Sequence, residues 1–271
     1  MTGTMRLKIV LILCCISAIS GNDIYNQAWY SKLDSSKQAH YDNLTDDITS
    51  FLNGGDDSHR HDEYRGFGPV LLRTSFHAAG TFDHKFNKGG INGGTLQHNK
   101  VLEKSGNACI DIATDVIKVF ARRNKISFAD TTAIAGALAL KSMDFPRMDL
   151  ISVKGGRFDL DASHAGGPSD LPNAQVNPLQ KFTDEYGFST AEFVALIGGA
   201  HSLGAAHAVC TCYAGSFSDR PLSWAGPDFF RDLVDEEWTW YTLTTFDDDT
   251  ITFTIGSEPD WPTGRGKREI Q

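Results

Sequence analysis

Three observations predict a mostly α-helical protein. Apolar residues recur with a period near 3.6 rather than 2 in most segments long enough to show a pattern. Residues that start and stop helices flank those segments. The alternation of strands and helices that a parallel sheet requires is missing along the chain. We therefore expect packed helices rather than an α/β sheet.

Two helical segments are predicted in the first third of the chain. Residues 27–52 place their apolar side chains at loosely helical spacing. Residues 68–80 follow a polar hinge, and Pro69 suits the first turn of a helix while Gly80 suits its end. The second segment is therefore expected to be a short, apolar helix.

Three more helices are predicted further along. One has apolar residues on a single face, namely Ile110, Ala113, Ile117 and Phe120. A second begins at Ser127 and continues to about Met143. The third begins with a capping box at Ser189–Glu192 and ends near His201. Residues 144–181 are expected to be irregular, and residues 242–255 alternate as a hairpin would.

Composition restricts the class of protein. The 271 residues are 41% hydrophobic and 22% charged, values of an ordinary globular chain that exclude wholesale disorder and a polytopic membrane protein. The formal net charge is −9, and no basic run is long enough to follow a phosphate backbone. We therefore expect no nucleic-acid partner.

The first twenty residues have the layout of a secretory signal peptide. Arg6 and Lys8 precede an apolar run from Ile9 to Ile19, and small residues end at Ser20. An uncleaved anchor is the alternative, but this run is shorter than the roughly 20 residues that span a bilayer. Cleavage of residues 1–20 predicts a secreted protein with no membrane association.

Three cysteines remain after cleavage, namely Cys109, Cys210 and Cys212. They cannot all pair within one chain. A bridge from Cys109 to either of the other two is compatible with the sequence, and a free buried thiol is the alternative.

Two histidines stand in unusual settings. Arg73 and His77 are four residues apart on one predicted helix, with Phe76 beside them, so the guanidinium and the imidazole share a face. A surface helix edge is the alternative. His201 lies at the end of an apolar helix, where a hydrogen-bonded core histidine is the alternative to a ligand. Ser202 nearly matches a nucleophile elbow, but no acid and histidine follow in the order that a hydrolase needs.

These residues resemble a known family. Residues Gly68–Asp83 are similar to the distal-helix signature of the plant, fungal and bacterial haem peroxidases, and Ala195–His207 are similar to their proximal signature. Intervening landmarks also match, including Gly156 and Arg157. The resemblance covers roughly residues 25–235. It implies a helical fold that holds haem b between a distal and a proximal helix.

The resemblance implies roles for individual residues. His201 would be the axial ligand of the haem iron. His77 would move a proton between the two oxygens of hydrogen peroxide, and Arg73 would stabilise the charge that develops. Asn107 would orient His77. Phe76 would pack over the haem.

Two further positions would contact the haem. His207 lies where some relatives contact a propionate, and Phe217 lies where the intracellular branch often has a tryptophan. Ala78 replaces the calcium-binding Asp of the secreted branches, so the ascorbate and cytochrome c peroxidase branch is the nearer match. Ser202 and Ser218 give only doubtful support for a proximal cation site, because the expected Asp falls near Ala225.

Other departures concern the supporting residues. The carboxylate that supports the distal asparagine in relatives falls at Val101, so this support is absent unless Glu103 substitutes. Cys210 stands where ascorbate users have a contacting Arg, which argues against ascorbate. The Asp that hydrogen-bonds the proximal histidine in relatives is not recognisable, and residues 241–271 form a divergent or truncated segment after a peroxidase domain at 21–240.

The sequence therefore predicts a secreted haem peroxidase. It would reduce hydrogen peroxide and oxidise small, phenolic donors in one-electron steps. The alternative is a catalytically weak or inactive peroxidase-like protein with a structural or interaction role.

Overall fold

The computed structural model describes residues 21–54, 66–87, 89–161, 171, 178–207, 210, 215–216, 218 and 220–235. The predicted signal peptide, Phe217, Cys212, the predicted hairpin and the divergent segment 241–271 lie outside these residues. The domain boundaries at 20 and 240 therefore remain predictions.

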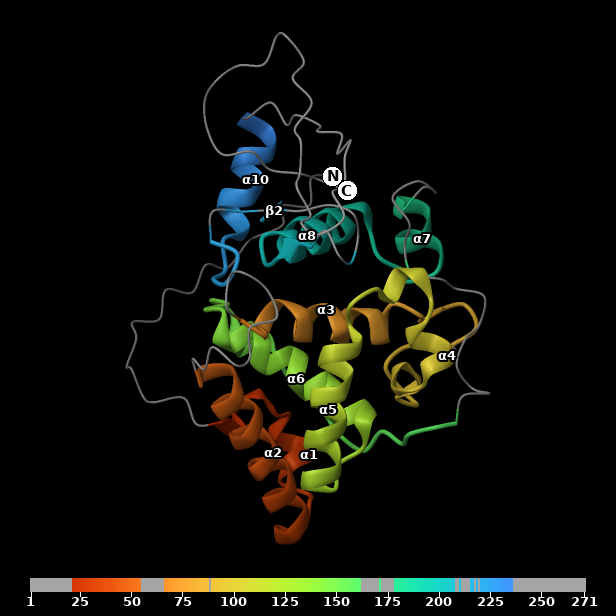
Figure 1. The fold of residues 1–271 in the computed structure, drawn as a ribbon, viewed down its shortest axis with the longest axis vertical. Helices are drawn as coiled ribbons and strands as arrows, with labels where there is room; N and C mark the ends of the chain where they lie inside the picture. The colour runs from red at the N-terminus through yellow and green to blue at the C-terminus, as the bar shows by residue number, and fades with distance from the viewer. Residues whose placement is uncertain are drawn as a thin grey trace, which may run out of the picture.

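The described chain is mostly helical, which confirms the predicted fold class (Figure 1). The α-helices are α1 (Gln27–Tyr30), α2 (Ser35–Asn53), α3 (Gly68–Ala79), α4 (Asn99–Leu102), α5 (Asp111–Asn124), α6 (Phe128–Ser142), α7 (Pro178–Asp184), α8 (Thr190–His201) and α10 (Gly226–Asp235). Short 3-10 helices occur at η1 (Gly21–Ile24), η3 (Thr95–Gln97), η4 (Ser105–Asn107) and η5 (Met148–Leu150). Strands β1 (Ala205–Ala206) and β2 (Gly215–Ser216) pair antiparallel, with Ala205 opposite Ser216.

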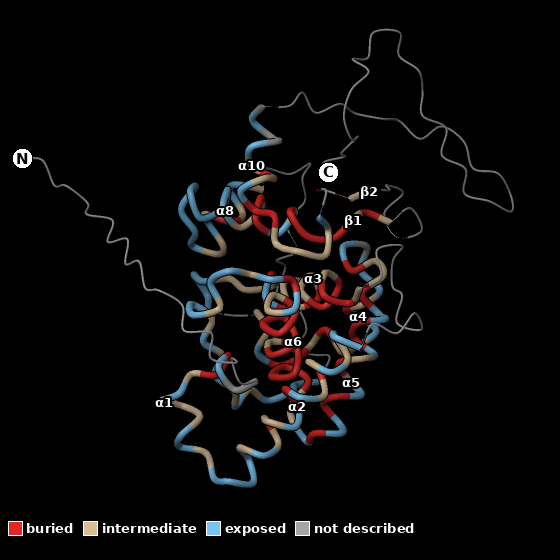
Figure 2. Tube along the Cα trace, turned by 90° about the vertical axis from the view of Figure 1, so that its left-hand side faces the viewer, coloured by how far each residue is buried: buried red, intermediate tan, exposed pale blue. Residues whose placement is uncertain are grey.

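Helix α6 is the centre of the larger layer, where α2, α3 and α5 pack around it (Figures 1 and 2). Its N-cap Ser127 accepts a hydrogen bond of 3.1 Å from the amide of Asp130. Most of its residues are small and buried. At Gly136 the backbone approaches α3 so closely that an added Cβ would lie 2.4 Å from Ser75 Oγ. The small residues of α6 therefore set the position of α3.

The second layer consists of α7, α8 and α10, and Figure 1 shows α8 across from α3. The predicted capping box starts α8, since Ser189 and Glu192 each bond the other's backbone amide. Gly198 lets the ring of Phe230 on α10 pack against α8, because an added Cβ would lie 2.2 Å from that ring. The close contact at Gly198 therefore fixes α8 against α10 within this layer.

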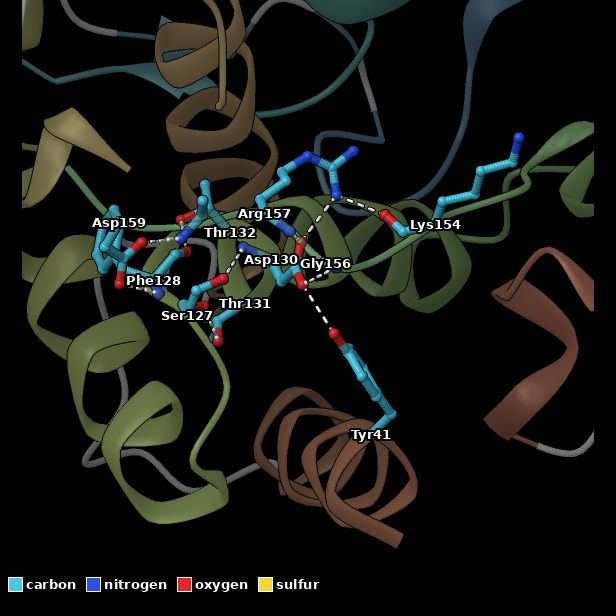
Figure 3. A network of polar contacts seen from close by, with 11 residues as sticks. Tyr41, Ser127, Phe128, Asp130, Thr131, Thr132, Lys154, Gly156, Arg157 and Asp159 are labelled. Carbon is cyan, nitrogen blue, oxygen red and sulfur yellow. Dashed lines mark hydrogen bonds and ion pairs between the residues drawn. The ribbon is translucent and has the colours of Figure 1, made fainter. Parts of the chain in front are cut away.

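A buried carboxylate ties the segment after η5 to the larger layer (Figure 3). Asp130 on α6 accepts hydrogen bonds from Tyr41 Oη at 2.8 Å, from the Gly156 amide at 2.6 Å and from Arg157 Nη1 at 3.0 Å. Nearby, Asp159 accepts from the amides of the first two residues of α6. The Gly156–Arg157 landmark is therefore part of a structural network that joins α2, α6 and residues 154–159.

The structure refines several predicted elements. The segment 27–52 contains two helices, because Asp34 caps α2 with a hydrogen bond from the Lys37 amide. Of the segment 144–181, the described residues are irregular except for η5 and the start of α7, and residues 162–170 and 172–177 lie outside the described part. Helix α10 was not predicted from the sequence. Among the described residues, none of the helices combines the length and apolarity needed to cross a membrane.

Candidate active site

A cavity of about 400 Å³ separates the two helices that carry the predicted site. Its volume is within the range typical of small-molecule sites. One wall comes from α3 and includes Arg73, Phe76 and His77. The facing wall comes from α8 and the residues after it, and includes His201 and His207. The structure thus brings five of the seven predicted site residues to one cavity.

Helix α3 presents its three polar and aromatic side chains on one side because of their spacing. Phe76 and His77 lie three and four residues after Arg73 and therefore lie near it on one face. The opposite face carries Leu71, Thr74 and Ala78, which are buried against the core. The rings of Phe76 and His77 meet edge to face, with centroids 6.1 Å apart. Packing of α3 therefore aims the reactive face into the cavity.

Asn107 orients His77. Nδ1 of His77 lies 2.9 Å from Oδ1 of Asn107, and Nδ2 of Asn107 donates to the carbonyl oxygen of Val101 at 2.8 Å. Because a carbonyl can only accept, the amide nitrogen must face Val101 and the amide oxygen must face His77. Nδ1 of His77 therefore carries the proton, and in the neutral ring Nε2 is the basic nitrogen. Asn107, the sixth predicted site residue, is itself buried.

The ring of His77 is held neutral. Burial lowers the pKa of His77 to about 4, and the positive charge of Arg73 acts in the same direction. The hydrogen bond to Asn107 partly opposes this shift of the pKa. At neutral pH the ring is therefore a base with a free-energy penalty for taking up a proton.

Arg73 is held by backbone carbonyls of the same segment that carries Asn107. Its Nη1 donates to the Ala108 carbonyl at 2.8 Å, and its Nη2 donates to the Gly106 carbonyl at 3.3 Å. Burial lowers the pKa of Arg73. One short segment therefore positions both the guanidinium and the imidazole of α3.

His201 presents its other nitrogen as a ligand would. Its Nδ1 lies 2.7 Å from the carbonyl oxygen of Ile197, one turn earlier in α8. Since the carbonyl accepts, Nδ1 carries the proton and the lone pair is on Nε2. Metal-binding histidines use this arrangement, in which one nitrogen donates to an acceptor and the other binds the metal. The tautomer of His201 is thus suited to axial ligation.

The loop after α8 returns close to α3. Gly204 has a φ of +81°, and an added Cβ there would lie 3.0 Å from Cβ of Pro69. Its amide donates to the Pro221 carbonyl at 2.7 Å. The glycine allows the turn that leads into β1 and to His207 at the cavity. Phe217, the last predicted site residue, lies outside the described residues.

The serine hydrolase interpretation does not fit the structure. Ser202 is fully buried at the end of α8, and its Oγ donates to the Gly199 carbonyl at 2.7 Å. A nucleophile elbow instead exposes its serine at a turn from strand to helix. Ser218 Oγ likewise donates to the Ser202 carbonyl. Within the described part of the chain, no group of three His, Cys, Asp or Glu side chains could hold a metal ion.

A flat, largely apolar cofactor with a central metal suits this cavity. Two imidazoles lie on its facing walls, one as a base and one in the tautomer of a ligand. Much of the remaining lining is apolar, including Leu72, Phe182 and Leu196. The residues present therefore fit haem, and they define a site of the haem peroxidase type.

Comparison with known proteins supports this class. The family model for peroxidase matches residues 56–234. The mitochondrial cytochrome c peroxidase of Aspergillus fumigatus is 35% identical over 175 residues, covering 64% of this chain and 46% of the relative. The mitochondrial cytochrome c peroxidase of Neurospora crassa is 32% identical over 203 residues, covering 74% of this chain and 54% of the relative. This chain belongs to the peroxidase family.

Membership of the peroxidase family also bears on the predicted branch of that family and on the predicted cofactor. The two relatives agree with the predicted ascorbate and cytochrome c peroxidase branch, and membership supports the predicted haem. The chain spans about half the length of the curated relatives it matches.

The predicted secretion is wrong. The relatives from Aspergillus fumigatus, Emericella nidulans and Neurospora crassa are all named as mitochondrial proteins. The prediction used the basic residues Arg6 and Lys8 as one part of the signal-peptide pattern. Organelle-targeting segments are basic too, so this part of the pattern did not discriminate between the two destinations.

Proposed function

We propose that this protein binds haem between α3 and α8 and reduces hydrogen peroxide to water. The observation that carries the proposal is the hydrogen-bonded pair of His77 and Asn107, which places a neutral base on the wall that faces His201. Membership of the peroxidase family supports it independently. The roles assigned to single residues below are part of this proposal.

His201 would hold the cofactor through Nε2, and His207 would contact it from the loop after β1. Phe76 would pack over its face. When bound, haem supplies the iron that accepts peroxide and the electrons that break the oxygen–oxygen bond.

His77 acts as the proton carrier in this proposal. Its unprotonated Nε2 takes a proton from one oxygen of hydrogen peroxide and returns it to the other, so that water can leave. Asn107 keeps Nδ1 protonated throughout, and the ring therefore presents the same nitrogen in each cycle. Arg73 stabilises the negative charge that develops on the departing oxygen.

The reducing substrate is proposed to be a small aromatic molecule that gives up one electron at a time. The apolar and aromatic lining of the cavity suits such a donor, and it includes Leu171 and Phe182. Cys210 also lines the cavity where ascorbate-oxidising relatives have an arginine, which does not favour an anionic donor. The relatives named above as cytochrome c peroxidases make cytochrome c the competing donor to test.

Absorption spectroscopy tests the proposal. The full chain is titrated with haem, mixed with one equivalent of hydrogen peroxide, and then given either a phenol or reduced cytochrome c. We expect a stable Soret band that changes with peroxide and recovers faster with the phenol.

His201→Ala should abolish tight haem retention, whereas His77→Ala should retain haem but react about 10²–10⁴-fold more slowly with peroxide. If the folded chain retains no haem, it is a peroxidase-like structural or interaction protein. Faster recovery with cytochrome c would reject the aromatic donor, and the proposed haem binding and peroxide reduction would stand.

A further inference from the structure

A disulfide bond joins the two walls of the cavity. It links Cys109 to Cys210 across 101 residues of sequence. Cys109 follows η4 and Cys210 follows β1, and both residues line the cavity. The sequence alone left the partner of Cys109 open between Cys210 and Cys212.

On the α3 side, the disulfide ends in the segment that holds both polar groups of the distal wall. The Asn107 side chain bonds His77, and the carbonyls of Gly106 and Ala108 accept from Arg73. All three contacts come from the three residues directly before Cys109. Movement of this segment would therefore displace the partners of Arg73 and His77 together.

The backbone at Cys109 needs to be held. Its φ is +57°, in the left-handed region that residues with a Cβ rarely adopt. Such conformations persist where surrounding interactions determine them, and they cluster at binding and catalytic sites. The bond to Cys210 is a covalent restraint on this residue.

On the other side, the disulfide ends close to the proximal helix in sequence. The Cys210 amide donates to the His207 carbonyl at 2.9 Å. The preceding strand β1 pairs with β2, and Gly204 before it bonds Pro221. Cys210 is therefore hydrogen-bonded to the segment that follows His201, and this segment lines the same cavity.

We propose that the Cys109–Cys210 disulfide is a positioning device that holds residues 106–108 so that Asn107 orients His77 and the two carbonyls orient Arg73. The inference rests on the proposed peroxidase function. It makes the reactivity of the site depend on the redox state of this cysteine pair. A dithiol reductant would break the sulfur–sulfur bond, become a cyclic disulfide itself, and leave two protonated thiols.

The kinetic test compares three haem-loaded proteins: the natural chain, the Cys109→Ser/Cys210→Ser double variant, and Cys212→Ser as the matched control that retains the bond. The rate constant with peroxide is measured against pH, with and without a dithiol. We expect the double variant to react about 10–100-fold more slowly, as for loss of an orienting partner. The dithiol should slow the natural chain and Cys212→Ser to the same extent and leave the double variant unchanged. Equal rates and equal pH profiles for all three proteins would refute the proposal.

A second measurement needs neither haem nor turnover. The titratable groups that line the cavity are Arg73, His77, His201 and His207. NMR titration of the His77 ring, with amide hydrogen exchange at residues 106–109, is carried out before and after dithiol treatment of the folded natural chain. We expect reduction to speed exchange at this segment and to change the pKa of His77, because both Asn107 and Arg73 act on that pKa. If neither changes while circular dichroism shows an intact fold, the positioning role is wrong. If both change in a chain that does not retain haem, the positioning role stands and the proposed function fails.

Discussion

The backbone carbonyl of Val101 accepts a hydrogen bond of 2.8 Å from the side-chain amide of Asn107. This contact fills the place of the carboxylate that the resemblance led us to look for at position 101. Glu103, the alternative considered from the sequence, is exposed to solvent. A main-chain atom therefore sets the amide orientation that fixes the tautomer of His77. The supporting group can be a carbonyl because all it must do is accept one N–H.

The first prediction concerns Asn107. Asn107→Val removes the acceptor for Nδ1 of His77, so the ring can rotate or change tautomer. We expect the rate constant for reaction with peroxide to fall about 10–100-fold, as for other partners of orienting hydrogen bonds. Stopped-flow mixing of the haem-loaded variant with peroxide measures it. Val101→Ala is the matched control, because it keeps the carbonyl and should react at nearly the natural rate. A slow Val101→Ala variant with an intact fold would show that the side chain, not the carbonyl, matters.

The second prediction is the pH dependence of the reaction. Burial and Arg73 lower the pKa of His77 to about 4, so the base is unprotonated throughout the neutral range. We expect the rate constant with peroxide to stay level from neutral pH down to roughly pH 5 and to fall as the pH passes through about 4. His77→Gln should be slower throughout and lose this pH dependence. A midpoint near the ordinary value for histidine, about 6.5, would contradict the buried, neutral ring.

The same pKa shift has a consequence for stability. The unfolded chain takes up a proton near pH 6.5, whereas the folded chain does so only near pH 4. Between these values the unfolded state binds more protons, so the free energy of unfolding rises with pH. As the pH falls through this window, His77 should cost the fold up to about 3 kcal/mol. Urea unfolding of the haem-free chain, compared with His77→Gln at several pH values, measures this cost. Parallel curves for the two proteins would exclude it.

Helical segments were predictable where local signals and packing agree. Pro69 at the start of α3 and the capping box at Ser189 both mark helix starts that the structure confirms. These signals are local, because a cap satisfies amides within one turn. Four of the five predicted residues that line the cavity lie on these two helices, and only His207 lies beyond them, after β1.

Features that depend on distant partners were not predictable from the sequence. The choice of Cys210 over Cys212 depends on how η4 and β1 come together in space. The Val101 carbonyl has no side-chain signal at all, because every residue carries one. The destination of the chain was mispredicted for a different reason, since basic residues near the N-terminus are shared by more than one kind of targeting signal.

The third prediction concerns the buried carboxylate of Asp130. It accepts from Tyr41, from the Gly156 amide and from Arg157 (Figure 3). The side chain of Arg157 is 24% exposed. Asp130→Asn removes the charge while Arg157 stays partly buried, so we expect the free energy of unfolding to fall by on the order of 3 kcal/mol. Tyr41→Phe removes one neutral donor and should cost about 1 kcal/mol. Urea unfolding measures both, and equal losses would show that the charge of Asp130 contributes little.

The fourth prediction concerns the disulfide and uses the same measurement. Breaking the Cys109–Cys210 bond releases a loop of 101 residues in the unfolded chain. Loop-closure entropy then predicts a loss of about 4–5 kcal/mol in the free energy of unfolding. The Cys109→Ser/Cys210→Ser variant tests it, with Cys212→Ser as the control that should unfold at nearly the natural urea concentration. A loss in Cys212→Ser as large as in the double variant would mean that the entropy of this loop is not the cause.

The last prediction concerns the contact between Gly136 and Ser75, which sets the distance between α6 and α3. An alanine at position 136 would bring its Cβ to 2.6 Å from Cβ of Ser75, which cannot rotate away as a longer side chain could. Alanine gains about 1 kcal/mol over glycine inside a helix, but overpacking costs about 1–3 kcal/mol. We therefore expect Gly136→Ala to be neutral to destabilising and to shift α3, which lowers haem affinity.

Adding Ser75→Gly removes the clash and should restore haem binding, although it lowers the helix propensity of α3. A double-mutant cycle of unfolding and haem titration measures the coupling. Additive effects of the two substitutions would show that α3 and α6 do not meet at this pair.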